Sequence, residues 1–213
     1  MAKAAFWPSR GRRRSQEHPQ AQTLSIVTEP GTRVVLHVGC GSIGEGGLHA
    51  SYIGPEWAEL RLDIDPDVEP DVVASITDMS PVPDASVDAV CSRHNIEHVF
   101  AHEVTQAIAE FFRVLRPGGE VMLATPDLQG VAKAIASGRL EDPLYQSQAG
   151  AITPLDVVYG YGPQIAEGRE YMAHRTGFTR GTLTRRLGSA GFVGIDVARK
   201  APYELVARAT RPS

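Results

Sequence analysis

The sequence has little cysteine and no long run of apolar residues. Its two cysteines, Cys40 and Cys91, are too few for a disulfide framework or a cysteine-based metal cluster. No segment approaches the ~20 consecutive apolar residues that a membrane-spanning helix needs. We therefore expect reduced thiols, a cytoplasmic location and no contact with membranes.

Acidic side chains are absent from residues 1–16, which carry five basic ones. The rest of the chain contains 16 basic and 25 acidic side chains, so the body of the protein is acidic. Such a body is poorly suited to binding nucleic acid through its overall field, and we find no nucleic-acid motif. We predict that residues 1–31, which lack apolar periodicity, form a basic, disordered arm and linker. Residues 32–213 are predicted to form one domain.

From residue 33 onward, short apolar runs alternate with loops. We expect strands at 33–38, 59–64, 71–76, 87–92 and 120–125, and helices at 102–115 and 181–190. Two more strands, at 192–199 and 203–209, predict an antiparallel hairpin at a sheet edge. The predicted fold class is α/β: a Rossmann-like, doubly wound sheet of about seven strands that ends in this hairpin.

Residues 127–178 interrupt this alternation. Weak helical segments at 128–136 and 154–159 are separated by glycines and prolines, and four tyrosines lie in the same region. We interpret residues 127–178 as an insertion that covers a substrate site.

A glycine-rich loop follows the first predicted strand. Residues 39–44 read Gly-Cys-Gly-Ser-Ile-Gly, and Asp63 follows the first glycine at a spacing of about 20 residues. Glycines allow a ligand to approach the backbone closely, and a carboxylate at the end of the second strand can accept hydrogen bonds from two ribose hydroxyls. Both NAD-binding and methyltransferase folds use this arrangement, so the loop alone does not distinguish them.

Several other segments resemble the motifs of one enzyme family. Residues 35–41 look like its first motif, residues 62–66 like its ribose-binding segment, and residues 76–79 like its adenine-binding segment. Residues 87–98 and 112–119 resemble its fourth strand with the following site segment, and its entry into the fifth strand. From about residue 33 to 125, and again in the final hairpin, the chain resembles the class I S-adenosylmethionine-dependent methyltransferases of the generic methyltransferase-domain type.

This resemblance implies S-adenosyl-L-methionine as the cofactor. It places Asp63 on the ribose hydroxyls, Asp78 on the adenine amino group and Met79 against the adenine ring. The residues expected to bind the cofactor are Gly39, Cys40, Gly41, Gly44, Asp63, Ile64, Asp78, Met79, Arg93 and His94. The chain departs from the family at His37, where an acid usually helps to order the glycine loop.

Two other function classes stay open on the sequence. An NAD-dependent dehydrogenase fits less well, because residues 45–58 contain three glycines and a proline and cannot form the long helix that normally follows an NAD loop. A catalytically inactive protein of the same fold, acting as a binding or scaffold partner, is favoured only by His37. We therefore favour a methyltransferase that acts on a small-molecule acceptor by in-line transfer, and we leave a homodimer open.

The acceptor is expected at the carboxyl ends of the fourth and fifth strands. Candidate residues there are Arg93, His94, Asn95, Glu97, His98 and Asp127. The spacing of His94, His98 and His102 would align them on a helix and permit a metal site, but we expect the helix to begin after His98 and therefore predict no metal.

We name His98, His174 and Glu97 as the catalytic residues. His98 and His174 are candidates for a base or for hydrogen bonds to the acceptor, and Glu97 is expected to hold His98 in place. Arg175 beside His174 would suit an anionic acceptor, and Tyr159 and Tyr161 are candidate pocket residues.

Overall fold

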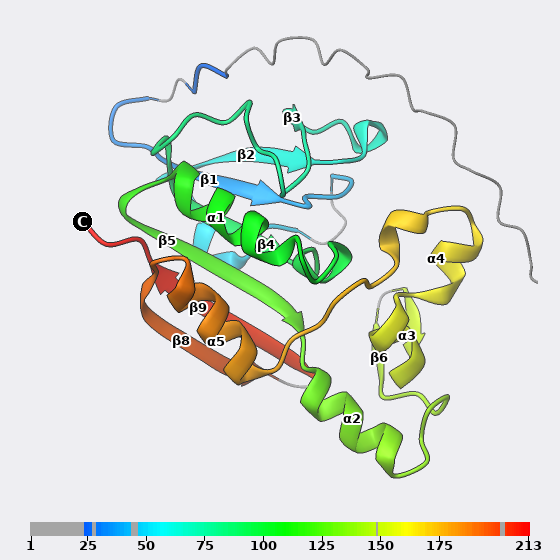
Figure 1. Cartoon of the computed structure of the whole chain (residues 1–213). Helices are drawn as coiled ribbons and strands as arrows, with labels where there is room; N and C mark the ends of the chain where they lie inside the picture. The colour runs from blue at the N-terminus through cyan, green and yellow to red at the C-terminus, as the bar shows by residue number, and fades with distance from the viewer. Residues whose placement is uncertain (1–23, 27–28, 44–46, 148, 201–202) are drawn as a thin grey trace, which may run out of the picture.

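The computed structural model describes residues 24–26, 29–43, 47–147, 149–200 and 203–213 (Figure 1). Most of the predicted arm, and Gly44 of the glycine loop, lie outside these residues. Within them, no helix is long and apolar enough to cross a membrane.

A seven-stranded sheet with the order β3-β2-β1-β4-β5-β9-β8 forms the centre of the molecule. Strands β1 to β5 run parallel, whereas β9 pairs antiparallel with both β5 and β8. This confirms the predicted α/β class and the antiparallel hairpin at the end of the chain. The strands are β1 (Arg33–Val38), β2 (Trp57–Asp63), β3 (Val72–Val73), β4 (Val87–Arg93), β5 (Leu115–Pro126), β8 (Val193–Lys200) and β9 (Glu204–Thr210).

The central strands are apolar on both sides because both sides are buried. In β1 the residues from Val34 to Val38 are all buried, and the neighbouring Val87, Val90 and Cys91 of β4 are fully inaccessible. Parallel strands that are covered on both faces read as continuous apolar runs, and this explains why β1 and β4 were predictable from sequence.

Two helices cover one face of the sheet, α1 (Val104–Val114) and α5 (Arg180–Ser189) (Figure 1). Ile108 and Phe111 of α1 pack in the same core cluster as Leu183 and Leu187 of α5. The helix predicted at 102–115 thus begins two residues later, and its apolar stripe faces the core as its spacing required.

A short segment, and no long helix among the described residues, covers the middle of the opposite face. The connections after β1 and β2 contain the one-turn 3-10 helices η1 (Ala50–Tyr52) and η2 (Pro66–Val68). Tyr52 is buried, stacks edge-on against Trp57 with ring centroids 5.1 Å apart, and donates a 2.8 Å hydrogen bond to Glu120. The glycines and proline that argued against a helix here are therefore part of a compact cover built around one tyrosine.

The predicted insertion lies beyond the carboxyl ends of the parallel strands (Figure 1). It contains α2 (Leu128–Ala136), a hairpin of β6 (Tyr145–Ser147) and β7 (Gly150–Ile152), α3 (Pro154–Tyr159), α4 (Gly162–Ala166) and η4 (Glu170–Met172). The two ends of the insertion are joined to each other by a hydrogen bond, which the Leu128 N–H donates to the Phe178 carbonyl at 3.0 Å. The two helices predicted at 128–136 and 154–159 are present with those bounds, whereas the hairpin had no sequence signal that we recognised.

Candidate functional site

A large cavity of about 820 Å³ lies at the carboxyl ends of β1, β2 and β4. Its walls come from the glycine loop, the end of β2, the segment after β3, the segment after β4 and the insertion. Predicted site residues in the lining are Gly39, Gly41, Asp63, Ile64, His94, Asn95, His98 and Arg175. The opening of a parallel sheet at its strand ends is where ligands of doubly wound folds bind.

Position 39 has to be a glycine, because the backbone there lies close to the segment after β4. Gly39 has φ +65°, and a Cβ at this position would lie 2.5 Å from the Asn95 side-chain carbon Cγ. Cys40, the next residue, is buried, and desolvation raises the pKa of its thiol to about 11. Cys40 therefore has a packing role here, and its thiol is not part of the cavity lining among the described residues.

Two side chains of strand β2 order the glycine loop by binding the N–H and the carbonyl group of Gly41. The Gly41 N–H donates to Asp63 Oδ2 at 2.9 Å, and the Gly41 carbonyl accepts from the Arg61 guanidinium at 2.5 Å. The other carboxylate oxygen of Asp63 accepts from the Asp65 N–H at 3.0 Å. Asp63 and Arg61 thus supply the ordering that we had expected from an acid at position 37. His37 itself is buried and pairs with Glu59 at 2.7 Å.

The two predicted residues after β3 lie away from the cavity. Met79 is fully buried in the core, where its N–H donates to Glu110 Oε2 at 2.7 Å, and Asp78 is exposed and accepts from the Ser80 N–H. Neither residue lines the cavity, which is bounded at this point by Ser75, Ile76 and Thr77. Asp78 and Met79 therefore lie outside the lining of this cavity, and their assignment to the adenine stays a prediction.

Arg93 is also placed away from the large cavity. It is the last residue of β4, its guanidinium donates to the Gly47 carbonyl at 3.0 Å, and it lines a second cavity of about 400 Å³. Arg93 therefore does not line the cavity of the glycine loop, and its assignment as a cofactor ligand stays a prediction. Glu204 and Arg208 of β9 line the same second cavity.

His94 follows the end of β4 and lies between two carboxylates, those of Glu97 and Glu204. It adopts a left-handed backbone with φ +48°, which is strained for a residue with a side chain. Its Nε2 donates to Glu204 at 3.0 Å, and its Nδ1 lies 3.5 Å from Glu97 Oε1. Desolvation acts to lower the pKa of His94, but the hydrogen bonds and charges of the two carboxylates outweigh it and raise the pKa to about 9. His94 is consequently a cation at neutral pH.

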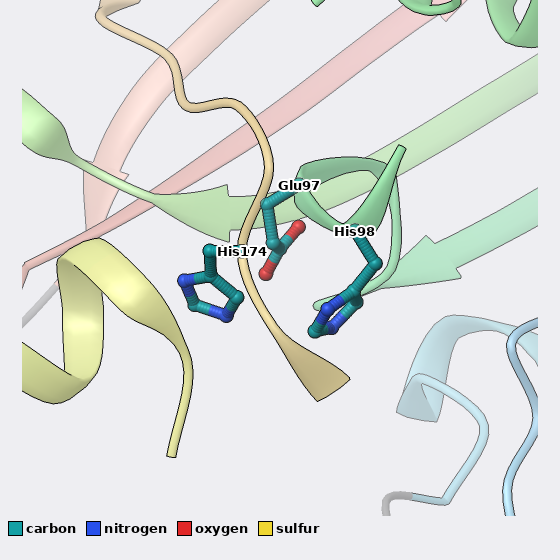
Figure 2. A group of neighbouring side chains, drawn as sticks. All are labelled: Glu97, His98 and His174. Atoms are coloured by element: carbon teal, nitrogen blue, oxygen red, sulfur yellow. The ribbon is translucent and has the colours of Figure 1, made fainter. Parts of the chain in front are cut away.

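Glu97, His98 and His174 form a cluster that joins the sheet to the insertion (Figure 2). One ligand atom from each lies within 4.8 Å of the others, and the imidazole centroids of His98 and His174 are 4.9 Å apart. Glu97 is 1% exposed and accepts from the Thr125 hydroxyl at 3.1 Å, whereas its Oε1 has no hydrogen-bond partner in the described structure. Burial raises the pKa of Glu97, yet the surrounding histidines lower it by more, so Glu97 is an anion.

Backbone hydrogen bonds made by residues 174–176 place His174 beside Glu97. The N–H groups of Arg175 and Thr176 both donate to the Glu97 carbonyl, at 2.9 and 3.1 Å, and the His174 N–H donates to Tyr159. His174 Nδ1 lies 2.8 Å from the Val157 carbonyl, so Nδ1 carries the proton and Nε2 keeps a free lone pair. Desolvation lowers the pKa of His174, and its ring is therefore neutral at pH 7.

Comparison with known proteins shows which family part of this chain resembles. Residues 36–123 match the family model of the methyltransferase domain. A Mycolicibacterium smegmatis protein named "Probable S-adenosylmethionine-dependent methyltransferase" is 49% identical over 47 residues, which are 22% of this chain and 18% of that relative. Residues 36–123 of this chain are therefore similar to the class I S-adenosylmethionine-dependent methyltransferases.

Two solved structures share the fold of this chain. A SAM-dependent methyltransferase of Methanosarcina mazei superposes with a TM-score of 0.57 at 20% identity and covers 85% of this chain and 93% of its own. The Burkholderia thailandensis 1,6-didemethyltoxoflavin-N1-methyltransferase, with bound 1,6-didemethyltoxoflavin and S-adenosylhomocysteine, superposes at 0.50 with 16% identity, covering 85% and 72%. At these identities the comparison shows the common fold alone.

Other predicted site residues have structural roles. Asp127 is buried, caps α2 through the Gln129 N–H and pairs with Arg199 at 2.8 Å. His102 stacks on Phe100 and is not part of the histidine cluster, because the α1 helix begins only at Val104.

The two tyrosines that we predicted to line the pocket, Tyr159 and Tyr161, lie outside the lining of the large cavity. Tyr159 is 63% exposed, and the Tyr161 hydroxyl donates to the Ala149 carbonyl at 2.6 Å; neither lines the large cavity. Tyr171 does line it, and donates across the cavity opening to Asp65 at 2.7 Å. No spacing pattern could have paired these two residues, because they are brought together only by the path of the insertion.

Proposed function

We propose that the protein transfers the methyl group of S-adenosylmethionine to a small-molecule acceptor by in-line displacement. The observation that carries this proposal is the meeting of the glycine loop, Asp63 and His98 around one cavity of about 820 Å³, which Glu97 and His174 adjoin through His98. A cavity of this size is in the range that holds a cofactor and a small ligand. The Burkholderia relative, whose name states a small-molecule acceptor, supports that class of substrate.

The residues of the cavity fit the cofactor. Asp63 keeps carboxylate lone pairs beyond the two that the loop uses, and these can accept ribose hydroxyls. Asn95 is part of the lining, and its amide Nδ2 is buried without a hydrogen-bond partner in the described structure. Buried donors of this kind are almost always satisfied, so a polar atom of the cofactor is its natural partner. The glycine loop at Gly39 and Gly41 leaves the backbone open for close approach.

The cofactor supplies an electrophilic methyl group on a positively charged sulfur. The protein then has to hold the acceptor in line and exclude water. Where the acceptor carries a proton, neutral His174 can accept it at Nε2, and the buried carboxylate of Glu97 stabilises the imidazolium that results. His98, which lines the cavity, would hydrogen-bond the acceptor. Arg175, also in the lining, would favour an acceptor with an anionic group.

Calorimetric titration of the full chain with S-adenosylmethionine, S-adenosylhomocysteine and NADH tests the cofactor. We expect micromolar binding of the first two and none of NADH. Binding of NADH alone would indicate the dehydrogenase, and binding of none of them would refute the proposal.

A turnover screen of small acceptors then tests the base. His174→Ala should reduce turnover far more than S-adenosylhomocysteine affinity, while His102→Ala, outside the cluster, should change neither. Equal losses of turnover and cofactor affinity in His174→Ala would place His174 in the cofactor site instead.

A further inference from the structure

We propose that Glu97, His98 and His174 bind a divalent first-row transition-metal ion such as Zn²⁺. The three side chains come from two segments that are distant in sequence, yet one ligand atom from each lies within 4.8 Å of the others. Figure 2 shows the carboxylate of Glu97 between the two imidazole rings. Metal ligands at bond lengths of about 2.0–2.2 Å lie roughly 3–4 Å apart, so only a small closure is needed.

The unsatisfied oxygen of Glu97 is the first reason to place a cation here. Oε2 accepts from Thr125, whereas Oε1 is buried and its polar neighbour His94 Nδ1 is at 3.5 Å without a hydrogen bond. A buried carboxylate oxygen with no hydrogen bond and only a long ion pair to His94 is costly, and a bound cation would satisfy it. The base function proposed above leaves this oxygen unexplained in the resting protein.

The histidine hydrogen bonds are the second reason. His174 donates from Nδ1 to the Val157 carbonyl, which fixes the ring and leaves Nε2 for a ligand, as second-shell carbonyls do around metal-bound histidines. Both ring nitrogens of His98 face carbonyl oxygens, Nδ1 that of Ala173 at 3.3 Å and Nε2 that of His94 at 3.1 Å. A metal–nitrogen bond of about 2.0–2.1 Å would lie on the line to one of these oxygens, so one of the two contacts has to open when His98 binds the ion.

The donor set selects the kind of metal. Two imidazole nitrogens and one carboxylate suit Zn²⁺, Fe²⁺ or Co²⁺, whereas Mg²⁺ and Ca²⁺ prefer oxygen ligands. Three protein ligands leave a coordination position open, as in catalytic zinc sites. The site adjoins the large cavity because His98 is part of its lining.

One consequence rests on the proposed function. If the acceptor binds in this cavity, the ion would favour an acceptor hydroxyl, because it would lower the pKa of that hydroxyl so that the proton leaves to solvent. The oxygen would then bond to the methyl carbon as the methyl–sulfur bond breaks and S-adenosylhomocysteine leaves. His174 would then serve as a ligand, and its role as base would belong to the metal-free protein.

Metal titration of the full chain, without an affinity tag and after removal of metals by a chelator, tests the site. We expect one Zn²⁺ per chain by calorimetry, and a visible absorption band when Co²⁺ is bound in its place. His174→Ala and Glu97→Gln should each weaken Zn²⁺ binding at least ~10-fold. His102→Ala removes a histidine outside the cluster and should leave it unchanged. Mg²⁺ should not displace Co²⁺ at equal concentration.

Two results would overturn the proposal: no saturable Zn²⁺ binding by the natural chain, or unchanged Zn²⁺ affinity in both ligand variants. Circular dichroism checks that the variants fold, and Glu97→Gln, which keeps the shape of the side chain, replaces His174→Ala if the latter does not. S-adenosylhomocysteine binding by the metal-free protein is measured in parallel. Its presence with no metal binding refutes only the metal site, and its absence with normal metal binding refutes only the methyltransferase function.

Discussion

Removing the Asp63 carboxylate should weaken cofactor binding more than any other single change in the glycine-loop region. In the structure this carboxylate accepts the N–H groups of Gly41 and Asp65, at 2.9 and 3.0 Å. Asp63→Ala therefore deletes two hydrogen bonds that order the loop, in addition to the acceptor for the ribose hydroxyls. All of these act on the same wall of the cavity.

The size of the effect follows from the charged character of the acceptor. A hydrogen bond to a charged group contributes about 1.5–3 kcal/mol when it is shielded, and less when it is partly exposed as Asp63 is. We expect a loss of about 1–3 kcal/mol in binding free energy, which corresponds to a roughly 5- to 150-fold higher Kd. Asp63→Asn should also be weakened, because one of its two side-chain atoms becomes a donor that faces a backbone donor.

Calorimetry with S-adenosylhomocysteine measures the change directly, and thermal unfolding of the same samples shows that the variants are folded. Asp67→Asn is the matched control, since Asp67 is an exposed acid that lines the same cavity. A folded Asp63→Ala with a Kd within twofold of the natural chain would refute both the ribose assignment and the role of Asp63 in ordering the loop.

Three further predictions address the rest of the site. His94 has a folded pKa of about 9 against an ordinary value of 6.5, so its ion pairs stabilise the protein fully below pH 6.5 and are lost as the pH rises through 9. The pKa shift corresponds to a nominal ~3 kcal/mol of folding stability, which we discount to about 1 kcal/mol because the side chain is 48% exposed. His94→Gln should abolish that part of the pH dependence of stability, as measured by urea unfolding. Tyr171→Phe removes the hydrogen bond to Asp65 across the cavity opening and should speed cofactor release in stopped-flow measurements by a factor of about 2–10, with little change in thermal stability. Gly160→Ala should destabilise the fold by about 1–3 kcal/mol and lower turnover, because Gly160 has φ +96° and a Cβ would lie 2.3 Å from the Met172 carbonyl; an unchanged unfolding midpoint would contradict this.

The parts of the fold that could be predicted are those set by local pattern. The strands β1 and β4 are short apolar runs ended by turn residues, and α1 has its apolar residues at helical spacing. Strand β3 was predicted over six residues and has two, because the chain after Val73 turns to line the cavity instead of continuing the sheet. Local pattern does not contain that information.

The parts of the site that could not be predicted depend on packing between distant segments. Helical spacing suggested a common face for His94, His98 and His102, but the left-handed backbone of His94 and the late start of α1 separate them. Met79 was assigned to the cofactor by resemblance, yet the segment from 79 to 84 is drawn onto α1 by Arg113, which donates to the Met79 and Val82 carbonyls. The directions of these side chains could not be predicted from the sequence, because they depend on packing between distant segments.

The backbone and the side chain of Glu97 have separate tasks, and this allows the cluster to be tested cleanly. Its carbonyl accepts the two N–H groups that fix the segment of Arg175 and Thr176, whereas its carboxylate faces the histidines. A substitution at Glu97 leaves the carbonyl in place, so Glu97→Gln changes the charge of the cluster without releasing the insertion from the sheet. A loss of turnover or of metal binding in that variant, with an unchanged unfolding midpoint, would therefore report the chemistry of the carboxylate and not the position of the insertion.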